Sequence, residues 1–145
     1  MRTSQEFSVA IHALLMLNNL PNEKITSEEI SISSGCNPTN IRKIFAKLRS
    51  AGLIITKSGK GRTTLAKPAD QITMWDIFSA VEGDCPDSIF TIHSCQNSDC
   101  MVGSHIPELL TPHYQRITEA MRDEMSSVTL SDLGMELNSL VRKGV

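Results

Sequence analysis

The stretch TSEEISISSGCNPTNIRKIFAKLRSAG, residues 26–52, contains the start and stop signals of two consecutive helices. Thr26 precedes two glutamates, a pattern in which the hydroxyl caps the first backbone amides of a helix, and Gly35 can take the left-handed conformation that ends one. Asn37 followed by Pro38 is a second start signal, because asparagine caps helices and proline favours the first helical position. Two helices separated by a short turn with glycine are typical of a helix-turn-helix.

The second helix of this pair separates its apolar residues from its basic ones. The apolar residues recur at the spacing of a buried helix face, at Ile41, Ile44, Phe45 and Leu48. The hydroxyl and basic side chains fall on the other side, at Thr39, Arg42, Lys43 and Lys47. Because a helix-turn-helix places its second helix in the major groove, this polar side is expected to reach base edges and phosphates.

A short basic hairpin is predicted directly after this helix. Gly52 ends the helix, the β-branched run Leu53–Thr56 predicts one strand, and Arg62–Leu65 predicts its partner. The residues between them, 57–61, contain two glycines and two lysines, as expected of a tight turn. A hairpin in this position is a wing, and the expected contacts with the DNA backbone or minor groove are Lys57, Lys60 and Arg62.

Positive charge is concentrated in this part of the chain. Residues 30–69 carry eight basic side chains and no acidic one, which leaves six basic and sixteen acidic side chains for the rest of a chain of net charge −2. A basic block on an acidic body indicates a face for a polyanion. Aromatic residues make up only 4% of the chain, too few for the stacking platform of single-strand and RNA binders. Duplex DNA is therefore the expected partner.

Two further helices flank the helix-turn-helix and complete an N-terminal domain. The first is predicted from Thr3 to Asn19, and Thr73 caps another that runs through Val81 and packs on the first. The expected fold class is mainly α with a small β-hairpin wing, as a winged helix-turn-helix domain over residues 1–82. No apolar run approaches the roughly 18 residues that cross a membrane, so we expect a cytoplasmic protein with no membrane partner.

A long amphipathic helix is predicted near the C-terminus, within a region assigned to residues 105–145. Pro112 either kinks this helix or begins it after a Thr111 cap, and the sequence leaves both open. Thr129 caps a final helix. Since a recognition helix needs a partner to read a second half-site, we expect a homodimer. The expected seam consists of Leu110, Tyr114, Ile117, Met121 and Met125.

The segment 83–104 has no periodicity and is predicted to be a sensor loop. It contains Cys85, Cys95 and Cys100, while Cys36 lies at the start of the recognition helix and could transmit oxidation. In a reducing compartment such thiols are more commonly ligands, redox centres or buried side chains than disulfides. The sequence leaves four alternatives open: a two-iron cluster, a thiol switch of Cys95 with Cys100, zinc, or no regulatory role.

Three stretches of the chain carry a resemblance to a known family: Ser8–Leu14 (SVAIHAL), Ile44–Leu53 (IFAKLRSAGL) and Ile72–Val81 (ITMWDIFSAV). With the cysteine loop and the terminal Val128–Leu133 (VTLSDL), they resemble the bacterial iron–sulfur-cluster regulators typified by IscR, NsrR and CymR. The resemblance implies a dimeric winged-helix transcription regulator. The DNA contacts expected from the recognition helix are then Thr39, Asn40, Arg42, Lys43 and Lys47.

The expected function is a sequence-specific transcriptional repressor that binds a pseudo-palindromic operator and responds to redox or iron–sulfur status. The candidate cofactor is an iron–sulfur cluster, beside the zinc alternative, and no metal ligand set is assigned. The alternatives are a winged-helix protein-interaction module and a regulator without cysteine-based sensing. No nucleophile or nucleotide-binding motif accompanies the four cysteines and four histidines, so no enzyme is expected.

Overall fold

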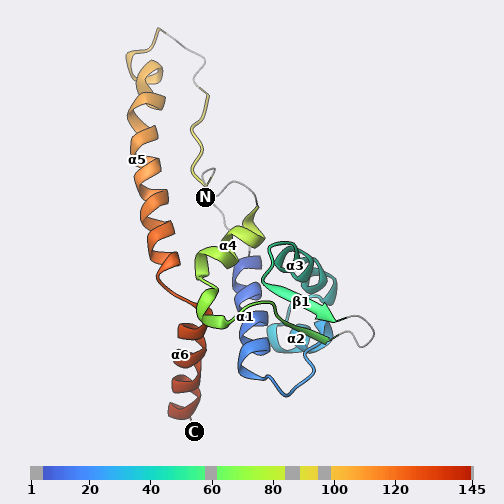
Figure 1. Cartoon of the computed structure of the whole chain (residues 1–145). Helices are drawn as coiled ribbons and strands as arrows, with labels where there is room; N and C mark the ends of the chain where they lie inside the picture. Colours follow the sequence, from blue (N-terminus) through green and yellow to red (C-terminus); the bar gives the residue numbers. More distant parts are fainter. Residues whose placement is uncertain (1–4, 58–61, 84–88, 95–98, 145) are drawn as a thin grey trace.

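The computed structural model of this chain describes residues 5–57, 62–83, 89–94 and 99–144. Its described part is mainly helical with one antiparallel hairpin, which confirms the expected fold class. The elements in chain order are α1 (Glu6–Asn19), α2 (Ser27–Ser34), α3 (Pro38–Ser50), β1 (Ile54–Lys57), β2 (Arg62–Leu65), η1 (Ala69–Gln71), α4 (Met74–Glu82), α5 (Met101–Ser126) and α6 (Leu130–Lys143). Figure 1 shows α1 to α4 and the hairpin gathered in one body, from which α5 extends away.

The helix-turn-helix forms as its capping signals predict. The Thr26 hydroxyl accepts a hydrogen bond from the Glu29 amide at 3.2 Å, and α2 ends at Gly35 with a left-handed φ of 75°. The Asn37 side chain accepts from the Thr39 amide at 2.8 Å, with Pro38 at the first helical position. These local bonds satisfy the backbone groups at both helix ends and so fix the short turn between α2 and α3.

The core of the body lies where α1, α3 and α4 meet. The apolar stripe of α3 is buried as predicted, with Ile41, Ile44 and Leu48 at 1% exposure or less. Phe7 of α1 meets Phe78 of α4 edge to face with ring centroids 5.3 Å apart, which confirms that these two helices pack together. One face of α3 is thus committed to the interior, and its opposite face is left for solvent or a ligand.

The wing strands differ slightly from the prediction. The first strand begins at Ile54, one residue later than expected, and Ile54 pairs with Leu65 while Lys57 pairs with Arg62. Thr56 and Thr63 face each other across the ladder with hydroxyl oxygens 3.2 Å apart. The turn predicted at 57–61, including Lys60, lies outside the described residues from position 58 onward.

A small joint connects α5 and α6 to the body. Thr73 and Thr129 form an isolated antiparallel bridge, flanked by a bond from the Met74 amide to the Val128 carbonyl and one from the Leu130 amide to the Ile72 carbonyl. Both threonines also cap a helix through a reciprocal capping box. The connection between α5 and α6 is therefore tied by backbone bonds to the start of α4.

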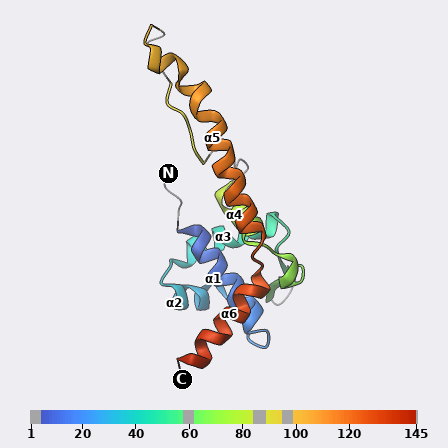
Figure 2. The same ribbon diagram turned by 90° about the vertical axis from the view of Figure 1, so that its left-hand side faces the viewer.

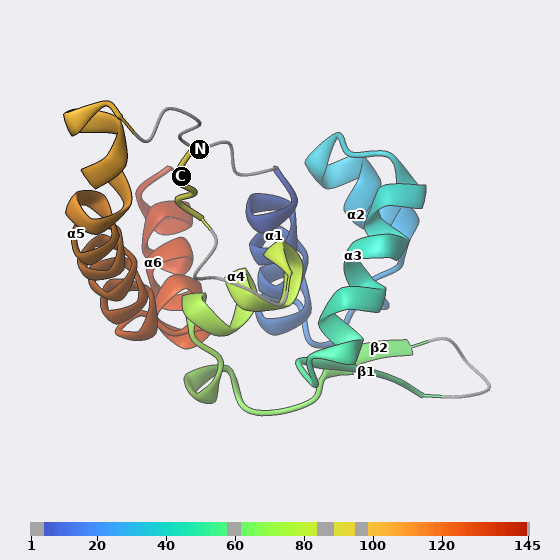
Figure 3. The same cartoon turned by 90° about the horizontal axis from the view of Figure 1, so that it is seen from above.

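The final helix packs closely on α1, with α1 between α6 and the α2–α3 pair in Figure 3. Gly134 lies against the first helix so tightly that an added Cβ would come 2.8 Å from the Asn18 side-chain nitrogen and 2.9 Å from the Asn19 side-chain oxygen. The Asn19 amide also donates to the Gly134 carbonyl at 3.2 Å. A side chain at this position would therefore make the ends of Asn18 and Asn19 shift, whereas the backbone φ of Gly134 is not positive and does not itself favour glycine.

The long helix α5 begins earlier than the sequence predicts. It starts at Met101, inside the segment expected to be loop, and continues through both Pro107 and Pro112 to Ser126. Pro112 therefore lies within the helix, and the Thr111 hydroxyl donates to the Pro107 carbonyl instead of capping a helix start. In Figure 2 the helix extends well beyond the body, with residues 89–94 running alongside it.

Candidate nucleic-acid interface

The outward face of α3 is polar and open to solvent. Thr39, Asn40, Arg42 and Lys43 are all exposed. At 100° per residue, Thr39 and Lys43 lie along the middle of this face, whereas Arg42 and Lys47 fall on opposite margins. The helix thus offers hydroxyl, amide and cationic groups on one accessible surface, as the sequence predicts.

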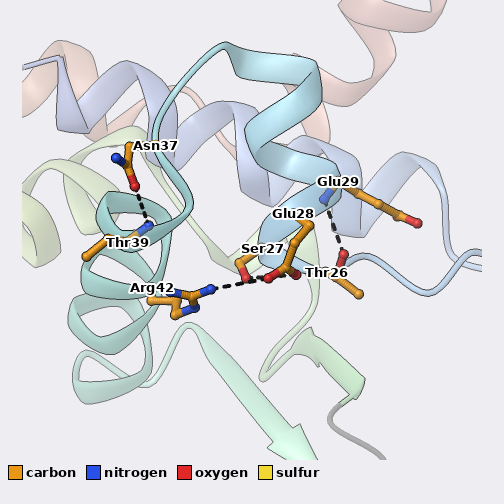
Figure 4. Close-up of polar contacts among 7 residues, drawn as sticks. All are labelled: Thr26, Ser27, Glu28, Glu29, Asn37, Thr39 and Arg42. Atoms are coloured by element: carbon orange, nitrogen blue, oxygen red, sulfur yellow. Dashed lines mark hydrogen bonds and ion pairs between the residues drawn. The ribbon is translucent and has the colours of Figure 1, made fainter.

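Arg42 is held by an acidic residue of α2. Its Nη2 lies 3.2 Å from Oε1 of Glu28, an ion pair drawn in Figure 4. Both side chains are more than half exposed. The other carboxylate oxygen of Glu28 accepts a hydrogen bond from the Ser27 hydroxyl at 3.2 Å. Hydrogen bonds from its own backbone amide, from Ser27 and from Arg42 lower the pKa of Glu28. An anion is therefore present among the cations of this surface.

Lys47 is placed differently from the other candidates on α3. Its Nζ lies 2.7 Å from Oε2 of Glu6 and also donates to the Val81 carbonyl at 3.2 Å. The sequence placed Lys47 with Arg42 and Lys43 on the outward face, but these bonds turn its ammonium toward α1 and α4. The pattern of α3 alone could not show this, because both partners come from distant parts of the chain.

The basic side chains of the wing that the structure describes lie at the last residue pair of the β1–β2 hairpin. Lys57 and Arg62 are paired residues on β1 and β2, and both are exposed. The guanidinium of Arg62 donates to the Pro21 carbonyl at 2.9 Å, which ties the second strand to the turn before α2. Lys60 lies outside the described residues.

Two basic residues beyond the predicted set lie close to Arg42. Lys24 and Arg49 line a cleft of about 320 Å³ together with Arg42, Glu28 and residues of the hairpin. Arg49 is seven residues after Arg42 and so lies on the same side of α3, a spacing that could have identified it. Lys24 belongs to the turn before α2, outside the basic block, and no sequence signal connects it to this surface.

The described cysteines lie far apart in the fold and differ in exposure. Cys100 is exposed at the N-cap of α5, where its Sγ accepts a hydrogen bond from the Gly103 amide at 3.4 Å. Backbone N–H groups of Gly103 and Val102 lower the pKa of this thiol. Cys36 is half-buried against the core at the turn of the helix-turn-helix. Cys85 and Cys95 lie outside the described residues.

The apolar residues of α5 divide into two sets. The Tyr114 ring is half-buried and packs at a tilt against Phe90 with centroids 5.3 Å apart, and Leu110, Met121 and Met125 are also half-buried. A second set is exposed to solvent: Met101 at 78%, Val102 at 62%, Leu109 at 58% and Ile117 at 47%. Of the five residues predicted for a dimer seam, Ile117 is the most accessible.

The sequence pattern of the Rrf2 family, described as an iron-dependent transcriptional regulator, matches residues 3–136. This chain belongs to the Rrf2 family. It is a DNA-binding transcriptional regulator of winged-helix type, and its family and relatives are regulators, not enzymes. The resemblance drawn from the sequence is thereby confirmed at the level of the family.

Relatives and solved structures agree with this assignment. YwnA of Bacillus subtilis (strain 168), named as an HTH-type transcriptional regulator, is 28% identical over 130 residues, covering 90% of this chain and 95% of YwnA. A crystal structure of a DNA-binding protein superposes with a TM-score of 0.71 at 26% identity, over 88% of this Rrf2 chain and 97% of the other. CymR (YrzC), the global cysteine regulator of B. subtilis, shares the fold with a TM-score of 0.68 at 22% identity, over 93% and 97% of the two chains. Among the described residues no helix is long and apolar enough to span a bilayer.

Proposed function

We propose that this Rrf2-family protein acts as a homodimeric repressor that binds a pseudo-palindromic operator with α3 in the major groove. The observation that carries this proposal is the exposed polar face of α3 beside a basic hairpin. A helix in this geometry reads bases with side chains near its N-terminal end. We assign that role to Thr39, Asn40 and Lys43, which lie on the accessible face of the first turns of α3.

The margins of the face are proposed to contact the DNA backbone. Lys57, Lys60 and Arg62 are the wing contacts, and Arg42 is a contact on the side of α2. Phosphate contacts position a protein on the duplex, whereas base contacts provide sequence information. Lys47 is the weakest member of the set, because its ammonium already bonds Glu6 and the Val81 carbonyl.

The dimer is proposed to form through α5. This helix has 26 residues, so it is about 39 Å long at 1.5 Å per residue, and Thr118 is its only side chain classed as buried among the described residues. Val102, Leu109 and Ile117 follow one another at spacings of seven and eight, which places them on one stripe of exposed apolar surface. A second α5 would cover this stripe together with the half-buried Leu110, Tyr114, Met121 and Met125.

The signal is proposed to be thiol oxidation centred on Cys100. A thiolate at a helix N-cap is a better nucleophile at neutral pH than an ordinary thiol. The Cys100 thiolate would attack a peroxide, forming a sulfenic acid and releasing water or an alcohol. The Cys95 thiol would then displace water from this sulfenic acid to form a disulfide, and a thiol reductant would reverse the step by exchange. Cys36 takes no part in this reaction, and oxidation of Cys100 would reach it only through a change in the fold.

An iron–sulfur cluster is the second candidate signal, favoured by the family's description as iron-dependent. A cluster needs several thiolate or imidazole ligands around one point. In the described part of the chain, no group of three His, Cys, Asp or Glu side chains is arranged to hold a metal. Cys100 is the one described cysteine of this region, so the described residues do not themselves make a cluster or zinc site, and no step is assigned to one.

The test of the proposed function is selection of duplexes from a random pool by the purified protein. The expected result is a motif of two inverted half-sites whose centres are about one helical turn, or a multiple of it, apart. Enrichment of a single unrepeated half-site would contradict the proposal that the protein binds DNA as a dimer. If no motif were enriched, the proposal of sequence-specific binding would be contradicted.

A further inference from the structure

The cleft beside α3 has the composition of an anion site. It lies between the start of α2, the margin of α3 and the hairpin, and Lys24, Arg42 and Arg49 all line it. Glu28 is the one acidic side chain that lines it, so the cleft carries a net charge of +2. Hydroxyl groups of the same cleft come from both of its walls, at Thr26, Ser27, Thr56 and Thr63.

The structure holds the two guanidinium groups of this cleft in fixed places. Nη2 of Arg49 donates to the Thr56 hydroxyl at 2.8 Å, and that hydroxyl lies 3.2 Å from the hydroxyl of Thr63, which is 8% exposed. Nη2 of Arg42 is placed by Glu28 at 3.2 Å. A guanidinium has five N–H donors, so each arginine keeps donors for a further oxygen.

We propose that this cleft receives one backbone phosphate of the bound DNA, held by Lys24, Arg42 and Arg49, and that Glu28 holds Arg42 in place until the phosphate replaces it. This inference rests on the proposed binding of α3 in the major groove. A phosphodiester carries one negative charge and accepts several hydrogen bonds, which matches three cations and neighbouring hydroxyls. The cleft lies at the margin of the reading face, where the DNA backbone passes when a helix occupies the groove.

Glu28 has a separate consequence for affinity. Its carboxylate repels a phosphate that approaches the cleft and competes with it for Arg42. Removing the charge while keeping the shape, by Glu28→Gln, is expected to strengthen binding to every duplex. The same change is expected to leave sequence preference unaltered, because a phosphate contact carries no base information.

The experiment compares Lys24→Gln, Arg49→Gln and Glu28→Gln with Lys143→Gln, a matched control on the exposed end of α6. Dissociation constants are measured by fluorescence anisotropy on the selected operator and on a scrambled duplex, from about 50 to 300 mM salt. Each lost phosphate contact makes the slope of log K against log salt shallower by about one. Lys24 is exposed and lies in the turn before α2, so Lys24→Gln serves as the variant least able to disturb the fold.

The expected result is that Lys24→Gln and Arg49→Gln weaken binding to both duplexes by the same factor, with a slope shallower by about one, while Glu28→Gln strengthens both. Wild-type slopes for Lys24→Gln and Arg49→Gln would overturn the phosphate site. A loss confined to the operator would also overturn it, because that result indicates a base contact. Failure of the wild-type protein to bind any duplex would instead remove the proposed function on which the inference rests.

Discussion

Replacing Ile117 with aspartate tests the dimer through the most accessible residue of its predicted seam. Ile117 is 47% exposed in the single chain, so about half of its apolar surface is available for burial by a partner. Full burial of such a side chain contributes about 1.5–3 kcal/mol, and the available half therefore contributes about 1 kcal/mol in each protomer. A carboxylate buried without a partner costs several kcal/mol more.

Because a two-fold dimer contains the substitution twice, the loss should exceed about 4 kcal/mol, or roughly a thousandfold in the dimer dissociation constant. Sedimentation velocity at micromolar concentration should then show monomers for Ile117→Asp. Gln115→Asp places the same charge on the opposite side of α5 and should leave the dimer intact. Met121→Asp is a less clean test, since Met121 is half-buried within its own chain. An intact Ile117→Asp dimer would refute the assignment of this stripe to the interface.

Three other outcomes are expected from the same structure. Backbone N–H groups lower the pKa of Cys100, so its thiolate persists to lower pH. Alkylation of Cys100, followed by peptide mapping, should therefore continue at a pH where a cysteine in a short peptide no longer reacts. Identical pH profiles for the two thiols would contradict this. Gly134→Ala places a methyl group against the side-chain ends of Asn18 and Asn19, which must shift to admit it. Because alanine also gains about 1 kcal/mol of helix propensity over glycine, the free energy of unfolding in urea titration should change little, and a large loss would show that the two asparagines cannot move aside. Cys95→Ser should abolish the reversible effect of mild peroxide on DNA affinity, and a response equal to that of wild type would exclude Cys95 as the resolving thiol.

Local signals were sufficient for the helix-turn-helix. Thr26, Gly35, Asn37 and Pro38 each act on backbone groups within a few residues of themselves, so their effect can be predicted from spacing. The capping boxes at Thr73 and Thr129 were predicted for the same reason, and both form. Their pairing with each other across the joint was not predictable, because it joins segments far apart in the chain.

The sequence does not predict the start of α5, because the first turns of this helix lack an apolar stripe facing the body. Met101 and Val102 are exposed, so no burial pattern marks this end of the helix. The sequence does not decide the place of Pro112, because proline removes one backbone donor and disfavours, but does not forbid, a position inside a helix. The helix passes through it and through Pro107.

The candidate DNA surface was predicted in outline but not in its margins. Thr39, Asn40 and Lys43 are exposed as their helical spacing requires. Lys47 is drawn aside by Glu6, and Lys24 joins Arg49 beside Arg42. Each of these placements depends on which loops and helix ends pack beside α3. The spacing of residues along α3 alone cannot predict those neighbours.

The most direct test of the central claim, that α3 reads duplex DNA, is the operator affinity of Lys43→Ala. Wild type, Lys43→Ala and the control Lys143→Ala are compared by anisotropy on the selected operator and on a scrambled duplex at one salt concentration. Loss of a base contact costs about 1–3 kcal/mol, so Lys43→Ala should bind the operator roughly fivefold to 150-fold more weakly, with a smaller loss on the scrambled duplex. Equal operator affinities for Lys43→Ala and Lys143→Ala would contradict the placement of α3 in the major groove.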